Sequence, residues 1–293
     1  MRRHRIKEEL RDSLDGNGFR LVFQPKFTLS AQPRLAGAEV LLRWRHPELG
    51  EVSPAEFIPI AETTEVIVAV DRFVSSRLFA QIKAWRALGL DLPVIALNLS
   101  ARSLREADFT AALVRDLDEA GVPHTLLQVE ITEWALMEGS ATVLRNLEVL
   151  HREGIKISID DFGTGFSSFT YLKLMVVSEL KIDKSFVDGL GRTREDEAIV
   201  TAILALGNAL NLEMVAEGIE TPQQLEWLRN SGCPTGQGYL FSRPLERSEF
   251  EDLVIGPLSG DLDNSTMRAR CGNHVENRQS PPQPVRVRPF RYV

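Results

Sequence analysis

Residues 155–168 read Ile-Lys-Ile-Ser-Ile-Asp-Asp-Phe-Gly-Thr-Gly-Phe-Ser-Ser. The three isoleucines alternate with polar residues, which is the pattern of a strand that buries one face. Neighbouring side chains of a strand point to opposite faces, so Asp160 and Asp161 can serve one site only if the strand breaks there. Gly163 and Gly165 can supply that break, because glycine adopts backbone conformations that other residues avoid. We therefore expect a buried strand that ends in acid, although such a pair on its own is more often an ordinary polar junction between strand and loop.

Similar apolar strand patterns recur along the chain with helical patterns between them. The expected strands are 21–27, 35–44, 94–99, 126–132, 155–160, 179–182, 212–216 and 236–241. The expected helices are 53–61, 66–88, 103–120, 140–152, 169–174, 195–210, 222–230 and 248–254. A short polar loop joins the first two strands and suits an antiparallel pair, whereas the later alternation implies parallel strands with helical crossovers. The expected fold class is therefore α/β, a modified TIM-like (β/α)8 barrel with an antiparallel first strand pair.

Composition divides the chain into three expected parts. Residues 1–18 carry Ile6, Leu10 and Leu14 at four-residue spacing and are expected to form a helical lead-in to a barrel at 19–255. Residues 256–293 are rich in Gly, Ser, Asn, Pro and Arg, which predicts a disordered basic tail. A chain of 293 residues with 43% hydrophobic content can bury the large core that one barrel needs.

Charge and sequence signals restrict the functional classes. The formal net charge of −7 argues against a general binder of long nucleic acid. No stretch has the length and apolar character of a membrane span or of a signal peptide, so we expect a cytoplasmic protein. Cys233 and Cys271 are far apart and lack neighbouring histidines, which indicates neither a disulfide framework nor a zinc site.

Polar residues stand at or near the ends of seven of the eight expected strands. They are Glu39, Asn98, Glu130, Asp160, Lys181, Glu217 and Gln237. In a parallel barrel these ends converge on one mouth, which is where barrel enzymes carry their chemistry. A single such residue is more often a solvated rim residue, but seven together are hard to explain in that way.

With Asp161, which follows Asp160, this mouth would hold five carboxylates, which repel one another and lose hydration unless cations are present. A pair of divalent metals resolves the conflict, and ligands that offer only oxygen favour Mg²⁺ or Mn²⁺ over Zn²⁺. Two such ions suit in-line displacement at a phosphodiester. Lys181 could hold the attacking water or stabilise the developing charge, or it could be a plain ion-pair partner of the carboxylates.

Seven ordered motifs between about residues 21 and 253 resemble those of the EAL family of cyclic di-GMP phosphodiesterases. They are Glu39-Val40-Leu41-Leu42-Arg43-Trp44, Asn98-Leu99-Ser100, Glu130-Ile131-Thr132-Glu133, Asp160-Asp161-Phe162-Gly163-Thr164-Gly165, Lys181-Ile182-Asp183, Glu217-Gly218-Ile219-Glu220 and Gln237-Gly238-Tyr239. The resemblance implies a modified barrel that hydrolyses cyclic di-GMP to linear pGpG with Mg²⁺ or Mn²⁺, Ca²⁺ being typically inhibitory.

The resemblance also implies a role for each matching residue. The metal ligands would be Glu39, Asn98, Glu130, Asp160, Asp161 and Glu217. Lys181 and Glu217 would position and deprotonate the water. The substrate would meet Gln24, Arg43, Asp183 and Gln237. Glu133 and Glu220 would support the surroundings, Glu133 by fixing the loop after Asp161, through which relatives often form homodimers.

Two departures from the family pattern are visible. Val40 replaces the usual Ala of the glutamate motif, and Met175-Val176-Val177-Ser178 replaces a segment that usually has a Pro and an acid. The second change affects expectations for the loop and the dimer but not the metal ligands. Two alternatives stay open: a degenerate barrel that binds cyclic di-GMP as a receptor, and an interaction barrel with no nucleotide role.

Overall fold

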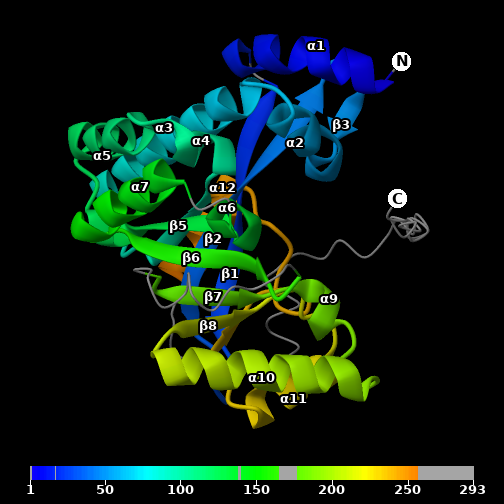
Figure 1. The fold of residues 1–293 in the computed structure, drawn as a ribbon. Coiled ribbons are helices and arrows are strands. Elements are labelled where there is room, and N and C mark those ends of the chain that lie inside the picture. Colours follow the sequence, from blue (N-terminus) through cyan, green and yellow to red (C-terminus); the bar gives the residue numbers. More distant parts are fainter. Residues whose placement is uncertain (1, 17, 138–139, 165–176, 257–293) are drawn as a thin grey trace.

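A computed structural model describes residues 2–16, 18–137, 140–164 and 177–256 and shows a closed barrel (Figure 1). Eight strands close in the order β1-β9-β8-β7-β6-β5-β4-β2, with β2 pairing back to β1, and β3 extends the sheet beside β2. The strands are β1 (Phe19–Thr28), β2 (Leu35–His46), β3 (Gly50–Val52), β4 (Val94–Asn98), β5 (Leu127–Thr132), β6 (Lys156–Phe162), β7 (Glu179–Ile182), β8 (Glu213–Ala216) and β9 (Thr235–Gly236). β1 runs antiparallel to both neighbours, β2 and β9, and the other barrel pairs are parallel. The expected fold class, including the antiparallel first pair, is confirmed.

Helices cover the outside of the barrel (Figure 1). They are α1 (Arg2–Asp15), α2 (Pro54–Glu62), α3 (Val66–Ala87), α4 (Ala101–Arg105), α5 (Phe109–Ala120), α6 (Glu133–Met137), α7 (Ala141–Arg152), α9 (Lys184–Val187), α10 (Arg194–Leu210), α11 (Pro222–Asn230) and α12 (Arg247–Ile255), with a 3₁₀ turn at His124–Leu126. The isoleucines of β6 are buried, as their alternation predicts. None of the helices in the described part of the chain is long and apolar enough to cross a bilayer.

Two expected elements differ in the structure. The expected strand 236–241 shortens to β9 because the chain turns after Gly236 and pairs with the segment that follows β8. There Ile219 donates its N–H to Gln237 and accepts that of Leu240. The expected helix 103–120 is two helices, since Glu106 adopts an extended conformation between α4 and α5, and the amide of buried Asn146 satisfies the carbonyls that this break exposes.

The N-terminal residues pack onto the barrel domain. Ile6 and Leu10 of α1 are 0% and 1% exposed, and the helix lies against α2 and α3. Ser53 directly precedes α2, with Pro54 in the first turn, and its side chain makes no capping hydrogen bond. The expected helix 169–174 and nearly all of the expected tail lie outside the described residues, and the division at residues 18 and 255 stays a prediction.

Candidate active site

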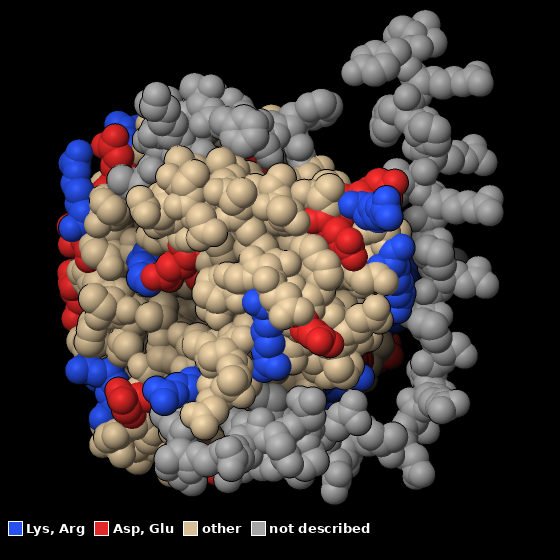
Figure 2. All heavy atoms as spheres, turned by 90° about the horizontal axis from the view of Figure 1, so that it is seen from below, with Lys and Arg blue, Asp and Glu red and all other residues tan. Residues whose placement is uncertain are grey.

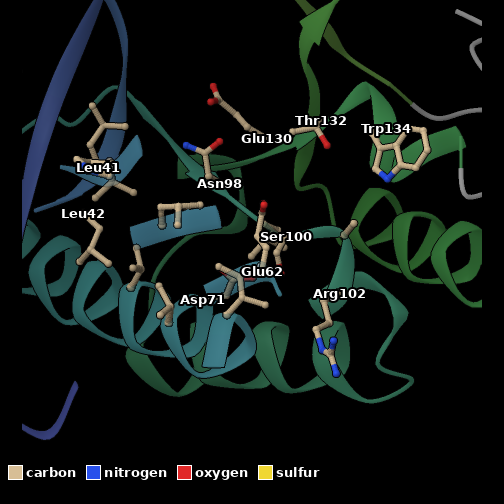
Figure 3. Close-up of a pocket in the computed structure, with 18 of the residues that line it drawn as sticks. Leu41, Leu42, Glu62, Asp71, Asn98, Ser100, Arg102, Glu130, Thr132 and Trp134 are labelled. Atoms are coloured by element: carbon tan, nitrogen blue, oxygen red, sulfur yellow. Dashed lines mark hydrogen bonds between the residues drawn. The ribbon is translucent and has the colours of Figure 1, made fainter. Parts of the chain in front are cut away.

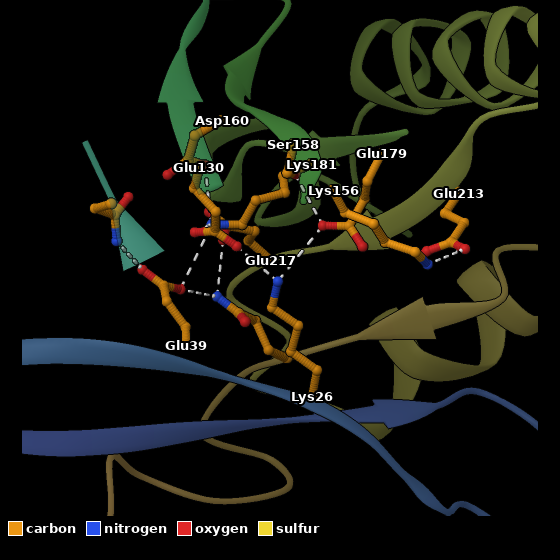
Figure 4. Close-up of polar contacts among 12 residues, drawn as sticks. Lys26, Glu39, Glu130, Lys156, Ser158, Asp160, Glu179, Lys181, Glu213 and Glu217 are labelled. Atoms are coloured by element: carbon orange, nitrogen blue, oxygen red, sulfur yellow. Dashed lines mark hydrogen bonds and ion pairs between the residues drawn. The ribbon is translucent and has the colours of Figure 1, made fainter. Parts of the chain in front are cut away.

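Lys181 of β7 lies at the centre of four carboxylates inside the barrel mouth (Figure 4). Its Nζ atom is 2.7 Å from Glu130 Oε2, 2.7 Å from Glu217 Oε1, 3.1 Å from Asp160 Oδ1 and 3.4 Å from Glu39 Oε2. The lysine is 0% exposed, so these ion pairs are shielded from water. The carboxylates come from β2, β5, β6 and the residue after β8, which is the convergence that the strand pattern predicts.

Asp160 and Asp161 reach one site through a bend at Asp161 itself. We expected the glycines after Phe162 to supply the break, but β6 continues to Phe162 and Asp161 has a φ of 54°. The β6–β7 register shifts between Ile159 and Phe162, as at a bulge. Aspartate tolerates this left-handed conformation better than most residues, because its short polar side chain bonds locally. As a result, Asp160, Asp161 and Glu217 each offer one oxygen within 4.8 Å of the others.

Glu39 lies in the middle of β2 rather than at its end, and two amides hold it. Asn98 Nδ2 donates to Glu39 Oε1 at 2.7 Å, and Gln237 Nε2 donates to Glu39 Oε2 at 2.9 Å and to Glu217 Oε1 at 2.8 Å. Burial alone would raise the pKa of Glu39. Attraction by Lys181 and Lys26, together with the two amide hydrogen bonds, outweighs burial and lowers this pKa to about 2. Glu39 is therefore a firmly ionised member of the cluster.

The other carboxyl groups shift in the opposite direction. Burial raises the pKa of Glu130 to about 7 and that of Glu217 to about 8, although Lys181 opposes both shifts. Burial, and then repulsion by Asp160, raise the pKa of Asp161 to about 6. Burial would lower the pKa of Lys181, but the surrounding carboxylates raise it well above its usual value. The protein alone therefore holds more carboxyl groups than one lysine can keep ionised.

A second buried layer beneath this cluster was missed from sequence. Lys26 of β1 places Nζ 2.6 Å from Glu130 Oε1 and 3.5 Å from Glu179 Oε1, and Ser158 Oγ donates to Glu179 at 2.8 Å. All four side chains are buried. The sequence does contain a signal for this layer, because residues two apart on a strand share a face. Lys26 lies two positions after Gln24, Ser158 two before Asp160 and Glu179 two before Lys181.

The donor set fits divalent metal ions. Six carboxylates and two lysines share the interior and mouth of the barrel, so the formal charge of the eight side chains is −4, which two divalent cations would neutralise. Carboxylate and amide oxygens are the ligands that Mg²⁺ and Mn²⁺ prefer. Gln237 Oε1 is also buried without a hydrogen-bond partner among the described residues, which leaves an acceptor available beside Glu39 and Glu217.

A cavity of about 390 Å³ opens beside the carboxylates (Figure 3). Asn98 and Glu130 lie along one side of it, and Trp134 of α6 stands on another. Leu42, Ile58 and other apolar side chains line the rest, and Arg43 contributes its half-buried guanidinium group, which donates to the Leu42 carbonyl at 3.0 Å. This size falls at the lower end of small-ligand pockets, roughly 300–1,000 Å³. Trp134 is 66% exposed and was not predicted as a site residue.

Two further expected site residues, Gln24 and Asp183, make their hydrogen bonds outside the carboxylate ring. Gln24 is opposite Glu39 on β1, but its amide donates to the Ser242 carbonyl at 2.6 Å. Asp183 caps α9 through the Ser185 N–H at 3.0 Å and contributes to the raised pKa of Asp161, after burial and Asp160.

Two acids serve neighbouring segments instead of the ring around Lys181. Glu133 Oε2 accepts the Gly163 N–H at 3.0 Å, which ties α6 to the turn after Asp161. Glu220 pairs with Lys184 of α9 at the rim, where its side chain is about half exposed. The structure therefore shows Glu133 in contact with the turn after Asp161, the segment that we expected it to fix, and Glu220 in contact with α9.

Known proteins share both the sequence pattern and the barrel. A model of the EAL domain family matches residues 7–244. The bifunctional diguanylate cyclase/cyclic di-GMP phosphodiesterase MucR of Pseudomonas aeruginosa is 40% identical over 245 residues, which cover 84% of this chain and 36% of that protein. The cyclic di-GMP phosphodiesterase NbdA of the same organism is 38% identical over 249 residues, covering 85% and 32% respectively. The chain thus spans about a third of the length of these curated relatives.

Solved structures agree with the sequence comparison. The PaMucR phosphodiesterase in complex with c-di-GMP superposes with a TM-score of 0.80 at 39% identity, covering 84% of this chain and 99% of that chain. The EAL enzyme Bd1971, in its form with cAMP and cyclic-di-GMP bound, gives a TM-score of 0.81 at 31% identity and covers 86% and 69% respectively. Because the family match extends over most of the chain, and the barrel superposes on these solved EAL structures, the chain belongs to the EAL domain family.

Proposed function

We propose that this protein hydrolyses cyclic di-GMP to linear pGpG in a reaction that depends on Mg²⁺ or Mn²⁺. The observation that carries the proposal is the ring of four carboxylates around Lys181, beside a cavity large enough for part of a nucleotide. Relatives named as cyclic di-GMP phosphodiesterases support the choice of substrate. The barrel at residues 19–255 would carry the activity, with 1–18 as its helical lead-in and 256–293 as an extension that the reaction does not need.

The metal-binding residues follow from the donor set. Glu39, Asn98, Glu130, Asp160 and Glu217 would hold one ion, and Asp160 with Asp161 would hold the second. Bound there, the ions would supply positive charge that stabilises the phosphodiester oxygens and acidifies a nearby water. Glu39 is ready to bind a cation, since its low pKa keeps it ionised throughout the physiological range. Glu130 and Glu217 would have to lose their protons when a cation arrives, so metal binding should strengthen as the pH rises.

Lys181 and Glu217 are the proposed catalytic pair. Glu217 lies 2.7 Å from Lys181 Nζ, so one water close to both would donate a proton to the carboxylate while the ammonium group orients its oxygen. That oxygen forms the new bond to phosphorus, the bond from phosphorus to the 3′ oxygen breaks, and this oxygen leaves as the 3′-hydroxyl after taking up a proton. The product is a linear dinucleotide with a 5′-phosphate.

Four further residues are proposed to bind the nucleotide. Arg43 would pair with a phosphate, because its guanidinium group lines the cavity next to the carboxylates. Gln24, Gln237 and Asp183 would lie along the substrate at the rim of the barrel. One guanine would enter the apolar part of the cavity, where Trp134 offers an exposed ring for stacking.

We also propose a homodimer that involves the segment following Asp161. Most of that segment, residues 165–176, lies outside the described residues, but its beginning packs near α10, because a side chain at Gly163 would meet Phe186 and Ile203. The sequence of α10 from Ala198 to Leu210 has no charged residue. Figure 2 shows the face that carries α10 and α11, with an uncharged area at its centre. A second copy of the chain is the partner we propose for this area.

The test is an assay of purified protein with cyclic di-GMP and Mn²⁺, with the products separated by chromatography. We expect conversion to the linear dinucleotide, which stops in EDTA and is suppressed by Ca²⁺. Calorimetry in Ca²⁺ gives the affinity for the intact nucleotide in parallel. Binding without conversion in saturating Mn²⁺ would overturn the enzyme and support a receptor, and neither binding nor conversion would leave an interaction barrel.

A further inference from the structure

Lys26 occupies a position that neither water nor substrate is expected to reach. It is 3% exposed, and its Nζ atom lies beneath the carboxylate ring, 2.6 Å from Glu130 Oε1 (Figure 4). The side chain starts on β1, opposite Gly37 of β2, and crosses the barrel to strands on the far side. Lys26 therefore does more than fill space, because its ammonium group donates hydrogen bonds to Glu130 and Glu179.

A buried cation at this place opposes the binding of other cations through electrostatic repulsion. If Lys26 served only as the ion-pair partner of Glu179, its ammonium group would not need to approach the carboxylate ring. The distance from Lys26 Nζ to Glu179 Oε1, 3.5 Å, is the longer of its two ion-pair distances. The shorter contact is with Glu130, whose other oxygen, Oε2, meets Lys181 at 2.7 Å. Glu130 is 0% exposed and thus bridges two lysines, one on each oxygen.

We propose that Lys26 is a positioning residue for the metal site: it holds Glu130 Oε1 below the ring and leaves only Oε2 on the side of the ring where metal ions would bind. This inference rests on the proposed function in so far as Glu130 is a metal ligand. Among the described residues, Lys26 is the one hydrogen-bond donor to Oε1. Without it, the carboxylate would lose the contact that fixes its rotation, and a buried oxygen would be left unsatisfied. Groups that orient metal ligands in this way typically change metal affinity by about 10- to 100-fold.

The decisive variant removes Lys26 without changing the net charge of the interior. Lys26→Met combined with Glu179→Met deletes one positive and one negative side chain, so a change in Mn²⁺ affinity reports the orientation of Glu130 and not the overall field. Replacing a buried ion pair by apolar side chains of similar size is often neutral for stability. The pair Lys26→Gln and Glu179→Gln keeps the same charge balance with polar side chains and serves if the methionine pair does not fold.

Mn²⁺ binding is measured by calorimetry and by electron paramagnetic resonance of the free ion, without nucleotide. We expect the double variant to bind Mn²⁺ at least about tenfold more weakly than wild type. Its melting temperature in EDTA should be lower, because Glu130 Oε1 loses its donor, but its unfolding should stay cooperative. Turnover should then recover at high Mn²⁺, because the groups that contact the water are unchanged. Ser158→Ala is the matched control, since it removes a hydrogen bond to Glu179 and leaves Lys26 on Glu130.

Unchanged Mn²⁺ affinity in the double variant would overturn the proposal and leave Lys26 as the counter-ion of Glu179. An equal loss in Ser158→Ala would also overturn it, since any disturbance of the layer would then have the same effect. Failure of the wild type itself to bind Mn²⁺ would overturn this inference together with the two-metal site. If the wild type binds Mn²⁺ but does not cleave cyclic di-GMP, the enzyme assignment fails while the role of Lys26 is still decided by the affinities.

Discussion

Replacing Lys181 by Ala tests whether one buried cation serves both stability and chemistry. The change removes four ion pairs of 2.7 to 3.4 Å and leaves four carboxyl groups facing one another in a largely buried site. Charged groups left in such a position do not stay ionised, because protonation costs less than burying an unpaired charge. The loss should therefore appear as a change in stability that depends on pH.

The magnitude follows from known costs of breaking buried ion pairs, about 3–5 kcal/mol when one partner is removed. Lys181 lowers the pKa of Glu130 and Glu217, so without it both folded-state pKa values rise further above about 7 and 8. The folded variant then keeps protons that the unfolded chain has released above its ordinary glutamate pKa of 4.5. Since the folded state binds more protons, the free energy of unfolding falls as the pH rises.

The assay is urea unfolding in EDTA at pH 5 and pH 8. We expect Lys181→Ala to be about 3–5 kcal/mol less stable than wild type at pH 8, with a smaller difference at pH 5. Mn²⁺ at pH 8 should restore much of the loss, because it displaces the protons and neutralises the carboxylates. A difference that is equal at the two pH values, or absent at pH 8, would refute the placement of Lys181 as the counter-ion of the ring.

The same variant separates enzyme from receptor. With the metals and the nucleotide still bound, the single-turnover rate in Mn²⁺ should fall by about 10² or more, the scale of positioned acid–base and electrostatic groups. The affinity for cyclic di-GMP in Ca²⁺ should be nearly unchanged. If wild type and variant bind alike and neither turns over, the catalytic assignment is wrong.

Three further variants test other parts of the site. Glu39→Ala should abolish hydrolysis and lower metal-free stability at pH 7 in urea, since it removes a carboxylate with a pKa of about 2 that the fold stabilises; wild-type turnover would remove Glu39 from the site. Glu133→Ala should lower kcat with little effect on KM, because the Gly163 N–H loses its acceptor; unchanged kinetics would argue against coupling through that turn. Trp134→Ala should raise KM about 5- to 100-fold if its ring stacks on a base, whereas Leu88→Ala, an equally exposed apolar side chain, serves as the control, and an equal effect of both would reject stacking.

Much of the barrel could be predicted because its strands carry period-two patterns and its helices carry apolar stripes. The pattern at 179–182 predicts β7 without error, whereas 236–241 misleads because Tyr-Leu-Phe at its end is typical of a strand although the structure places these residues in a turn. The turn depends on Gly238, where a Cβ atom would lie 2.2 Å from the backbone of Ile219, and such close approach is a tertiary property. The break between α4 and α5 likewise depends on Asn146, which is 40 residues away from Glu106.

The convergence of the four carboxylates on Lys181 could be predicted from the sequence, but the pairing of their atoms could not. Parallel strand ends place Glu130, Asp160 and Lys181 together, and the structure agrees. Residue spacing does not determine which atoms form pairs. The sequence therefore predicts that other carboxylates repel Glu39, whereas in the structure its lysine and amide partners stabilise its ionised form and lower its pKa. From repulsion alone, Glu39→Ala would stabilise the metal-free protein; from the contacts of Asn98 and Gln237 it should destabilise it.

The polar layer under the site links stability to metal binding. Barrel interiors are usually filled by branched apolar side chains, but here Lys26, Gln128, Ser158 and Glu179 occupy buried positions of β1, β5, β6 and β7. Apolar residues there would pack without a need for charge pairing, yet they could not hold Glu130 from below. The cost is a metal-free interior whose formal charge of −4 favours partial protonation and weakens the fold as the pH rises. Bound divalent cations would offset that negative charge only where the ligands are already oriented, and we infer that this orientation depends on Lys26, which lies beneath the carboxylate ring.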